Sequence, residues 1–323
     1  MIKKAYELTT TDKKIRMLIA GYPGIGKTTL GLSAPKPLLI DADRGLDRVQ
    51  NAHKTDFIQP ESYEELMADL TPDNLKDYET LVFDTGGQLF KFMGDYAKKQ
   101  NSVNGQKDGS LSLKGYGAVA RLFENLMNRA YYELNKNVVV LFHAKEEKDG
   151  GDVSRLRILV EGSTKDNVWQ PMDLGGFIEI HGDKRVISFK NTERHFGKCC
   201  HGIPDKFDIP LLDPSVKNDF LTKLFAQVNE NMKKDAEFFE EQRKKYLALM
   251  DEAKGLVEAV TDLETAKQAA DVIKSIEHIW TSRTEISSMF KEKIESLGIE
   301  YRKEEGDFFV KQEQETADDA QSA

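Results

Sequence analysis

The 323-residue sequence is poor in cysteine: it has only two, which are neighbours at Cys199 and Cys200. Adjacent cysteines are poorly placed for a structural disulfide, and their scarcity suits a reducing compartment. The sequence also lacks any apolar run near the roughly 18 residues that a bilayer span requires, and its first residues lack the apolar core of a secretory signal. We therefore expect a cytoplasmic protein with no membrane partner, rather than a disulfide-rich secreted domain.

The first two thirds of the chain have no excess of either charge. Residues 1–210 hold 30 basic and 30 acidic side chains, whereas residues 211–323 hold 16 and 25, which accounts for the whole formal net charge of -9. This asymmetry predicts a folded domain at residues 1–210, a helical region at residues 211–300 and an acidic, disordered tail at residues 301–323. Because nucleic-acid binding depends on a local basic surface, the overall acidity does not exclude it.

What the sequence does contain is a complete phosphate-binding loop. Residues 21–28 read GYPGIGKT and fit the pattern G-x-x-x-x-G-K-[ST] at every constrained position. The glycines allow backbone N–H groups to surround the phosphates of a nucleoside triphosphate, while Lys27 reaches the β- and γ-phosphates. The residues expected to bind the nucleotide are Gly21, Pro23, Gly24, Ile25, Gly26, Lys27, Thr28 and Thr29.

Four apolar runs that end in polar residues predict the rest of the fold. They lie at residues 17–20, 38–40, 81–83 and 138–142, with helical segments between them. This alternation is typical of an α/β domain with a mostly parallel sheet covered by helices. Since ligands of such sheets bind at the carboxyl ends of the strands, the polar residues that follow the runs should converge on the nucleotide.

Those strand ends supply the predicted metal and catalytic groups. Asp84 follows the third run and, with the Thr28 hydroxyl, is expected to hold Mg²⁺. Asp43 follows the second run and is the candidate to orient and deprotonate the attacking water. Asp41 lies two residues earlier, and we expect only one of these two carboxylates to face the γ-phosphate.

Two polar segments are candidates for contact with a nucleic acid. Residues 100–117 are rich in Gly, Ser and Asn and carry Lys107, Lys114 and Tyr116, which could grip phosphates and stack a base. Residues 145–165 form a second long polar segment that holds Arg155 and Arg157. The alternative for both segments is an ordinary solvated loop.

The order of these parts resembles that of the RecA-like ATPases, including the RadA branch and the smaller phage-encoded annealing ATPases with a minimal RecA core. The resemblance covers roughly residues 15–197. It implies that the position of the family's catalytic glutamate is taken by Asp43, that residues 83–85 are the Walker B segment, and that His143 is a catalytic sensor. It also implies that the two polar segments correspond to the family's DNA-binding loops.

Residues 190–197 are similar to the family's Lys-Asn-Arg-Phe-Gly element, with extra residues inserted. The resemblance implies that Lys190 or Arg194 acts on a nucleotide held by a neighbouring subunit; the alternative is that both are solvated hairpin residues. A further departure is Asp43 itself, because an aspartate reaches less far toward the water than a glutamate does.

The resemblance implies an ATPase that uses ATP and Mg²⁺, acts on single-stranded DNA, and assembles as a homo-oligomeric ring or filament. Other phage replication or recombination proteins are expected as partners, in the cytoplasm of the host cell. An alternative is an ATP-dependent adaptor or loader that recruits a replication protein through its C-terminal helices, predicted at residues 219–231, 234–259, 263–279 and 285–297. A small-molecule kinase shares the phosphate loop, but it would need a substrate lid with clustered arginines.

Overall fold

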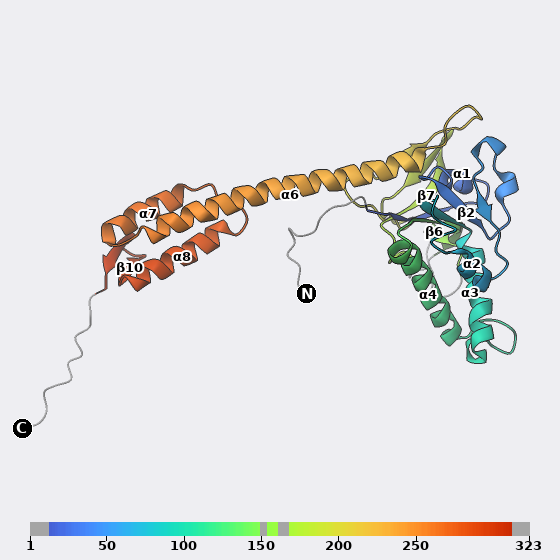
Figure 1. The fold of residues 1–323 in the computed structure, drawn as a ribbon, viewed down its shortest axis with the longest axis horizontal. Coiled ribbons are helices and arrows are strands. Elements are labelled where there is room, and N and C mark those ends of the chain that lie inside the picture. Colours follow the sequence, from blue (N-terminus) through green and yellow to red (C-terminus); the bar gives the residue numbers. More distant parts are fainter. Residues whose placement is uncertain (1–12, 149–153, 161–167, 312–323) are drawn as a thin grey trace, which may run out of the picture. The chain divides into compact units, whose positions relative to one another are not determined.

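The computed structural model of the chain describes residues 13–148, 154–160 and 168–311. The chain divides into two compact units between Lys233 and Lys234. The first unit contains a large sheet with helices around it, and the second is mainly helical (Figure 1). The first unit thus extends beyond the boundary predicted at residue 210.

A sheet of nine strands forms the centre of the first unit. Eight strands lie in the order β3-β2-β4-β5-β1-β7-β8-β9, and β6 pairs with β5 outside this path. All pairs from β3 to β7 are parallel, whereas β7-β8, β8-β9 and β5-β6 are antiparallel. The mostly parallel α/β sheet predicted from the sequence is confirmed. The strands are β1 (Arg16–Gly21), β2 (Pro37–Asp41), β3 (Phe57–Ile58), β4 (Thr80–Asp84), β5 (Asn137–Lys148), β6 (Ser154–Ile158), β7 (Leu174–His181), β8 (Lys184–Ser188) and β9 (Lys206–Ile209).

Helices cover both faces of this sheet. One face packs against α2 (Tyr63–Asp69), α3 (Gly86–Gln100) and α4 (Leu113–Asn128). The other face packs against α1 (Lys27–Gly31) and the first turns of α6 (Phe220–Glu258). Neighbouring residues of each central strand enter opposite cores, which explains why these strands are almost continuously apolar.

The carboxyl ends of the central strands lie next to one another. In the register of the sheet, Asp41 of β2 is opposite Asp84 of β4, and Gly21 of β1 is opposite His143 of β5. The predicted convergence of these polar residues therefore occurs. His143 differs from the prediction in one respect: β5 continues to Lys148, so this residue lies inside the strand and not at its end.

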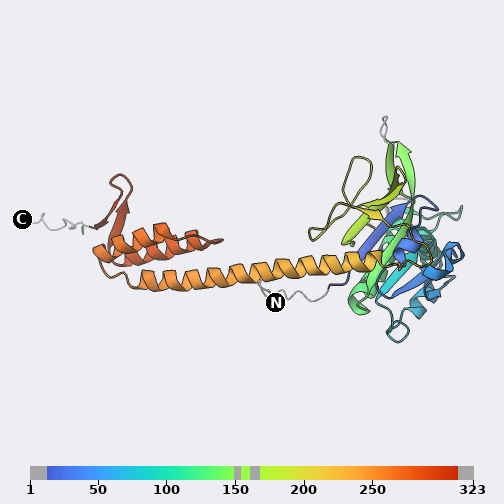
Figure 2. The ribbon, with the colours of Figure 1, turned by 90° about the horizontal axis from the view of Figure 1, so that it is seen from above.

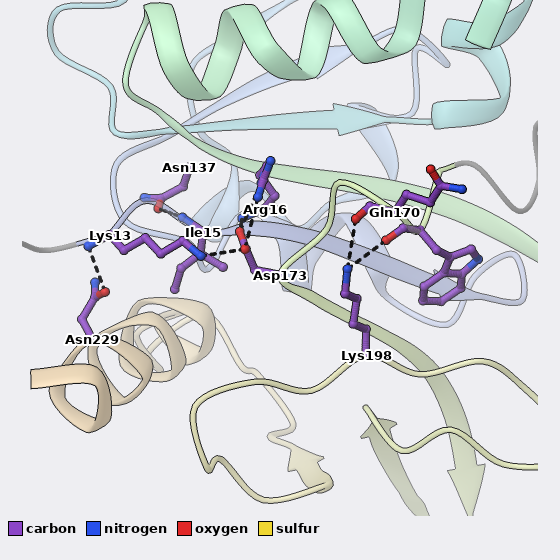
Figure 3. A network of polar contacts seen from close by, with 9 residues as sticks. Lys13, Ile15, Arg16, Asn137, Gln170, Asp173, Lys198 and Asn229 are labelled. Carbon is purple, nitrogen blue, oxygen red and sulfur yellow. Dashed lines mark hydrogen bonds and ion pairs between the residues drawn. The ribbon is translucent and has the colours of Figure 1, made fainter. Parts of the chain in front are cut away.

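A partly buried ion-pair network joins the start of β1 to the start of β7 (Figure 3). The Asp173 carboxylate accepts hydrogen bonds from the Arg16 backbone at 3.0 Å, from the Arg16 guanidinium at 3.2 and 3.3 Å, and from Lys13 Nζ at 2.8 Å. Burial opposes ionisation of Asp173, but the hydrogen bonds from Arg16 and Lys13 outweigh it and lower its pKa. The network supports the sheet at the end opposite the phosphate loop.

The second polar segment of the sequence is largely a strand pair and not a loop. Residues 144–148 of β5 pair with β6 to form a two-stranded arm, light green in Figure 2. Arg155 and Arg157 alternate along β6 with the buried Leu156 and Ile158. Their predicted place in a loop is therefore wrong, and residues 149–153 and 161–165 of that segment lie outside the described part of the chain.

The first polar segment is shorter than predicted, because α4 begins at Leu113. The Ser112 hydroxyl caps this helix by accepting a hydrogen bond from the Gly115 backbone at 3.1 Å. Lys114 and Tyr116 consequently lie in the first turn of α4, and Lys107 stays in the turn that precedes it. The turn itself is closed by a bridge between Gly105 and Leu111.

The second unit contains the rest of α6 together with α7 (Leu263–Ser275), α8 (Ser282–Ser296) and the hairpin of β10 (Ile299–Arg302) and β11 (Asp307–Val310), red in Figures 1 and 2. The break predicted between residues 231 and 234 is wrong, because α6 is continuous for 39 residues. The predicted tail is corrected as well: the hairpin occupies residues that we had placed in it, and residues 312–323 lie outside the described range. No helix in the described ranges is long and apolar enough to span a membrane.

Candidate active site

The phosphate loop connects β1 to α1 and has the backbone geometry that its glycines were expected to allow. Gly24 and Gly26 adopt φ angles of 77° and 91°, in the left-handed region that residues with a Cβ atom disfavour. At Gly26 a Cβ atom would also collide with the guanidinium of Arg185. Both glycines are thus favoured by backbone conformation, and at Gly26 the flexible end of the Arg185 side chain would also have to move to admit a Cβ atom.

Lys27 is nearly buried at the base of this loop, with 5% of its surface exposed. Its ammonium donates hydrogen bonds to the carbonyl oxygens of Gly21 at 3.1 Å and Tyr22 at 2.9 Å, and to Nδ1 of His143 at 3.2 Å. Burial lowers the pKa of Lys27 to about 8, against the opposing influence of Asp84 and Asp43. Burial and the nearby Lys27 charge also lower the pKa of His143, which fits an unprotonated Nδ1 that accepts this bond.

The lowered pKa of Lys27 predicts a stability change with pH in the nucleotide-free protein. The unfolded chain holds this proton up to about pH 10.5, whereas the folded chain releases it near pH 8. Between these values the unfolded state binds more protons, so the contribution of Lys27 to the free energy of unfolding rises with pH, by up to about 3 kcal/mol. Urea unfolding from pH 7.5 to 10.5 measures this. The free energy of unfolding of the wild type minus that of Lys27→Ala should rise with pH, and a constant difference would contradict the burial of a protonated lysine.

The two predicted metal ligands are in direct contact. The Thr28 hydroxyl donates a hydrogen bond of 2.5 Å to Oδ2 of Asp84, which is 5% exposed. Burial raises the pKa of Asp84, and the Thr28 hydrogen bond and the Lys27 charge oppose this rise. A hydroxyl and a carboxylate side by side suit Mg²⁺, which keeps several waters and takes few protein ligands. The described residues contain no cluster of three or more His, Cys, Asp or Glu side chains that could hold a metal ion by themselves.

The two carboxylates after β2 have different surroundings. Asp41 is fully buried and accepts hydrogen bonds from the backbone of Gly45 at 2.7 Å and Leu46 at 3.2 Å, and from Nε2 of Gln59 at 2.9 Å. Asp43 keeps 38% of its side chain exposed, and its charge partly opposes the lowering of the pKa values of Lys27 and His143 that burial causes. Asp41 therefore holds the turn after β2, and Asp43 is the carboxylate near the lysine of the phosphate loop.

Several predicted site residues lie away from this group. Arg194 forms ion pairs of 3.1 Å with both Glu146 and Glu179, and Lys190 lies 4.0 Å from Asp205. Among the predicted residues, those that the structure brings together around the loop are Lys27, Thr28, Asp43, Asp84 and His143. The remaining predicted contacts to nucleic acid lie on the α3–α4 connection, on the first turn of α4 and on β6: Lys107, Lys114, Tyr116, Arg155 and Arg157.

Sequence reasoning missed two groups that contact the phosphate loop. The Tyr22 hydroxyl donates a hydrogen bond of 2.9 Å to Glu146 on β5. Arg185 on β8 donates from one nitrogen to the Ile25 carbonyl at 3.3 Å and from another to the Pro210 carbonyl at 3.1 Å. Neither contact has a local sequence pattern, since each joins residues more than 100 positions apart.

Similarity to known proteins is found in a sequence family and among solved structures. No curated protein matches the sequence significantly. Among solved structures, a prototypical ATPase from the type III secretion system of pathogenic bacteria is similar, with 14% identity, a TM-score of 0.34 and 52% of each chain covered. The chain thus spans about half the length of that structure. The sequence model of a family described as AAA domain matches residues 13–200, more than half of the chain. With its complete phosphate loop, the protein therefore belongs to the AAA domain family and is a P-loop ATPase.

Proposed function

We propose that this ATPase acts on single-stranded DNA, as a homo-oligomer, in recombination, annealing or replication of a phage type. The observation that carries the proposal is the direct continuity between elements of the hydrolysis site and the two candidate DNA-binding segments. The nucleotide is ATP with Mg²⁺, and the site of action is the cytoplasm of the host cell.

Within the site, each side chain has one role in hydrolysis. Lys27 binds the β- and γ-phosphates, which replace the carbonyl oxygens that its ammonium now contacts. Asp43 orients the attacking water and accepts its proton. Thr28 and Asp84 would hold Mg²⁺, which when bound neutralises phosphate charge. His143, kept neutral by burial and by Lys27, senses the phosphates through the same lysine.

Helix α3 links the metal-binding carboxylate to the first basic segment. The helix begins at Gly86, immediately after the Asp84-Thr85 pair, and the Thr85 hydroxyl caps it. It ends at Gln100, about 22 Å away at 1.5 Å per residue, where the turn with the exposed Lys107 begins. A change at Asp84 on nucleotide binding would thus be transmitted to this turn by a rigid element.

Strand β5 makes the second link. It carries His143 at the site and continues into the arm with β6, where Arg155 and Arg157 lie. Glu146 on the same strand accepts the hydrogen bond from Tyr22 of the phosphate loop. Both candidate DNA-binding segments are therefore one element away from a residue that the nucleotide would contact, as coupling between DNA and hydrolysis requires.

Homo-oligomer formation would complete the γ-phosphate side of the site with a cation from the neighbouring subunit. Arg194 is held within its own chain by Glu146 and Glu179, so it would have to leave two carboxylates to act in this way. Lys190 has 59% of its side chain exposed and only a 4.0 Å approach to Asp205. Of the two candidates, Lys190 needs the smaller rearrangement.

The proposed function is tested by the rate of ATP hydrolysis with and without single-stranded DNA across a salt series. We expect stimulation by DNA that weakens as salt rises, because protein cations replace counterions on the phosphates. Hydrolysis that stays equal with and without DNA, together with no DNA binding at any salt concentration, would contradict the proposal.

Neutralising Lys107 and Lys114 together should weaken single-strand binding regardless of base sequence. The slope of log affinity against log salt should flatten by roughly 0.7 for each lost phosphate contact. The matched control is the double variant of Lys76 and Lys91. These lysines are also exposed, and neutralising them removes the same charge from the unit. If the control flattens the slope equally, the effect comes from net charge and the turn is not the contact.

A second candidate function, an adaptor that recruits a replication protein, is favoured by one observation in the second unit. Phe238 and Trp280 expose 62% and 51% of their surfaces, and the Trp280 ring stacks on Phe239 at 5.1 Å. Exposed aromatic residues of this kind are enriched at protein interfaces. DNA stimulation distinguishes the candidates, since an adaptor with incidental hydrolysis would lack it.

A further inference from the structure

An open pocket lies on the first unit, away from the phosphate loop. It is lined by Trp169, Phe196, Gly197 and Lys198. The rings of Trp169 and Phe196 are 6.3 Å apart between centroids and tilted by 57°, and Phe196 keeps 42% of its surface exposed. An exposed phenylalanine beside a tryptophan offers flat apolar surface to a ligand with a π-face.

The walls of the pocket are fixed by β7. The Trp169 ring stacks on the buried Phe177 at 5.9 Å, and it fills the space where Gly175 has no side chain. Gly175 and Lys198 exchange two backbone hydrogen bonds of 2.8 Å, which hold the opposite wall to the same strand. The aromatic surface is therefore held in place by the sheet.

Cations border these aromatic rings. The Arg157 guanidinium lies over the Phe196 ring at 4.8 Å from its centroid. Lys198 Nζ donates to the carbonyl oxygens of Trp169 at 3.4 Å and Gln170 at 3.0 Å (Figure 3). Since an ammonium has three donors, Lys198 retains one for an anion. Aromatic rings interleaved with cations are the combination that binds single-stranded nucleic acids.

We propose that this pocket stacks a base of single-stranded DNA on Trp169 and Phe196, with Lys198 and Arg157 at the adjacent phosphates. The inference rests on the proposed function and adds a base-contacting site to it. The predicted contacts on the α3–α4 connection would grip the strand elsewhere.

A chain of contacts joins the pocket to the phosphate loop. The Arg194 backbone carbonyl accepts a hydrogen bond of 2.7 Å from Leu156 of β6, and the Arg194 side chain pairs with Glu146. Glu146 in turn accepts the hydrogen bond from Tyr22. A base that enters beside Phe196, two residues after Arg194, would therefore act on residues that contact the phosphate loop.

The direct test uses Trp169 as its own probe. The chain has only two tryptophans, so Trp280→Phe leaves Trp169 as the single emitter. Titration with oligothymidine should quench this emission, because a stacked thymine contacts the indole. An abasic strand of the same length, which keeps every phosphate, should leave the emission unchanged. Equal quenching by both strands, or no quenching despite measured binding, would overturn the proposal.

Affinity measurements with the same two strands supply the second test. Phe196→Ala should weaken binding of oligothymidine roughly 5- to 150-fold, the range for loss of one stacked base, and leave abasic binding unchanged. Phe196→Leu keeps an apolar side chain and is the control for loss of the fold. It should also weaken binding of oligothymidine, by a smaller factor, and leave binding of the abasic strand unchanged. The matched control is Ile180→Ala on β7, also exposed, which should bind both strands as the wild type does.

The outcomes separate this inference from the proposed function. If DNA stimulates hydrolysis but the Phe196 variants bind each strand with the affinity of the wild type, the pocket inference fails and the proposed function stands. If no DNA binds, both fail. Should Trp169 emission change with protein concentration in the absence of DNA, the pocket is an interface between copies of the chain, and the proposal is wrong.

Discussion

The Lys27→Ala variant is expected to lose ATP hydrolysis by roughly a hundredfold or more, together with most of its nucleotide affinity. The ammonium of Lys27 lies at the base of the phosphate loop, between two loop carbonyls and His143, and carries the positive charge next to Asp43 and Asp84. No other lysine or arginine is hydrogen-bonded to this group of carbonyls in the described residues. Nucleotide titration and steady-state turnover measure the two losses.

The matched control is Lys136→Ala. Lys136 also has a pKa lowered by burial, and its ammonium donates hydrogen bonds to the carbonyl oxygens of Leu75 at 2.7 Å and Tyr78 at 2.6 Å. It lies just before β5, at the opposite end of the strand from the site, so its loss should reduce stability and not turnover per folded molecule. Turnover at the wild-type rate in Lys27→Ala would show that the phosphate loop is not the site of hydrolysis.

The part of the site that follows from the sequence is the part encoded locally. The phosphate loop is eight consecutive residues, and its geometry depends on Gly24 and Gly26 within them. Asp84 could be placed because an apolar run before a carboxylate predicts the end of a buried strand. The choice of Asp43 over Asp41 came from the resemblance, which places the family's catalytic glutamate at position 43, because the two-residue period of a strand puts both residues on one face and cannot separate them. The burial of Asp41 agrees with the choice.

The contacts that could not be predicted join distant parts of the chain. Tyr22 meets Glu146 only because β5 lies beside β1 and continues beyond His143. Arg185 reaches the phosphate loop because β7 pairs with β1 and returns through β8. In the same way Trp169 and Phe196, 27 positions apart, meet through β7. Such juxtapositions depend on strand order, which no local pattern specifies.

Composition misled the prediction at the C-terminal end. The acidic residues after position 300 favour disorder, but Phe308 is buried against Phe290 of α8 and the turn at Gly306 has a φ of 66°. Burial of one aromatic side chain on an existing helix thus offsets the acidic composition of the hairpin. The prediction divided the long helix α6 into two for a related reason. The polar residues near position 232 weaken the apolar period, but they do not break a helix, since none of them is proline or glycine.

The Asp43→Asn variant is expected to bind ATP within a few fold of the wild type and to hydrolyse it slower by on the order of 10² or more. An amide of the same shape can still contact a water but cannot accept its proton. The Asp43 backbone donates a hydrogen bond of 3.1 Å to the Asp84 carbonyl, which the substitution leaves in place, so the strand end should keep its position. Single-turnover hydrolysis and a separate binding titration distinguish chemistry from affinity.

Two neighbouring carboxylates make the test specific. Asp84→Asn should raise the Mg²⁺ concentration needed for half-maximal turnover, because it removes a predicted metal ligand next to Thr28. Asp41→Asn should instead lower the free energy of unfolding, by about 1–3 kcal/mol, since an amide cannot accept all three hydrogen bonds that the buried carboxylate receives. A residue that only holds the turn cannot set the rate of proton transfer. If fully folded Asp41→Asn lost more turnover than Asp43→Asn, the assignment of the general base to Asp43 would therefore be wrong.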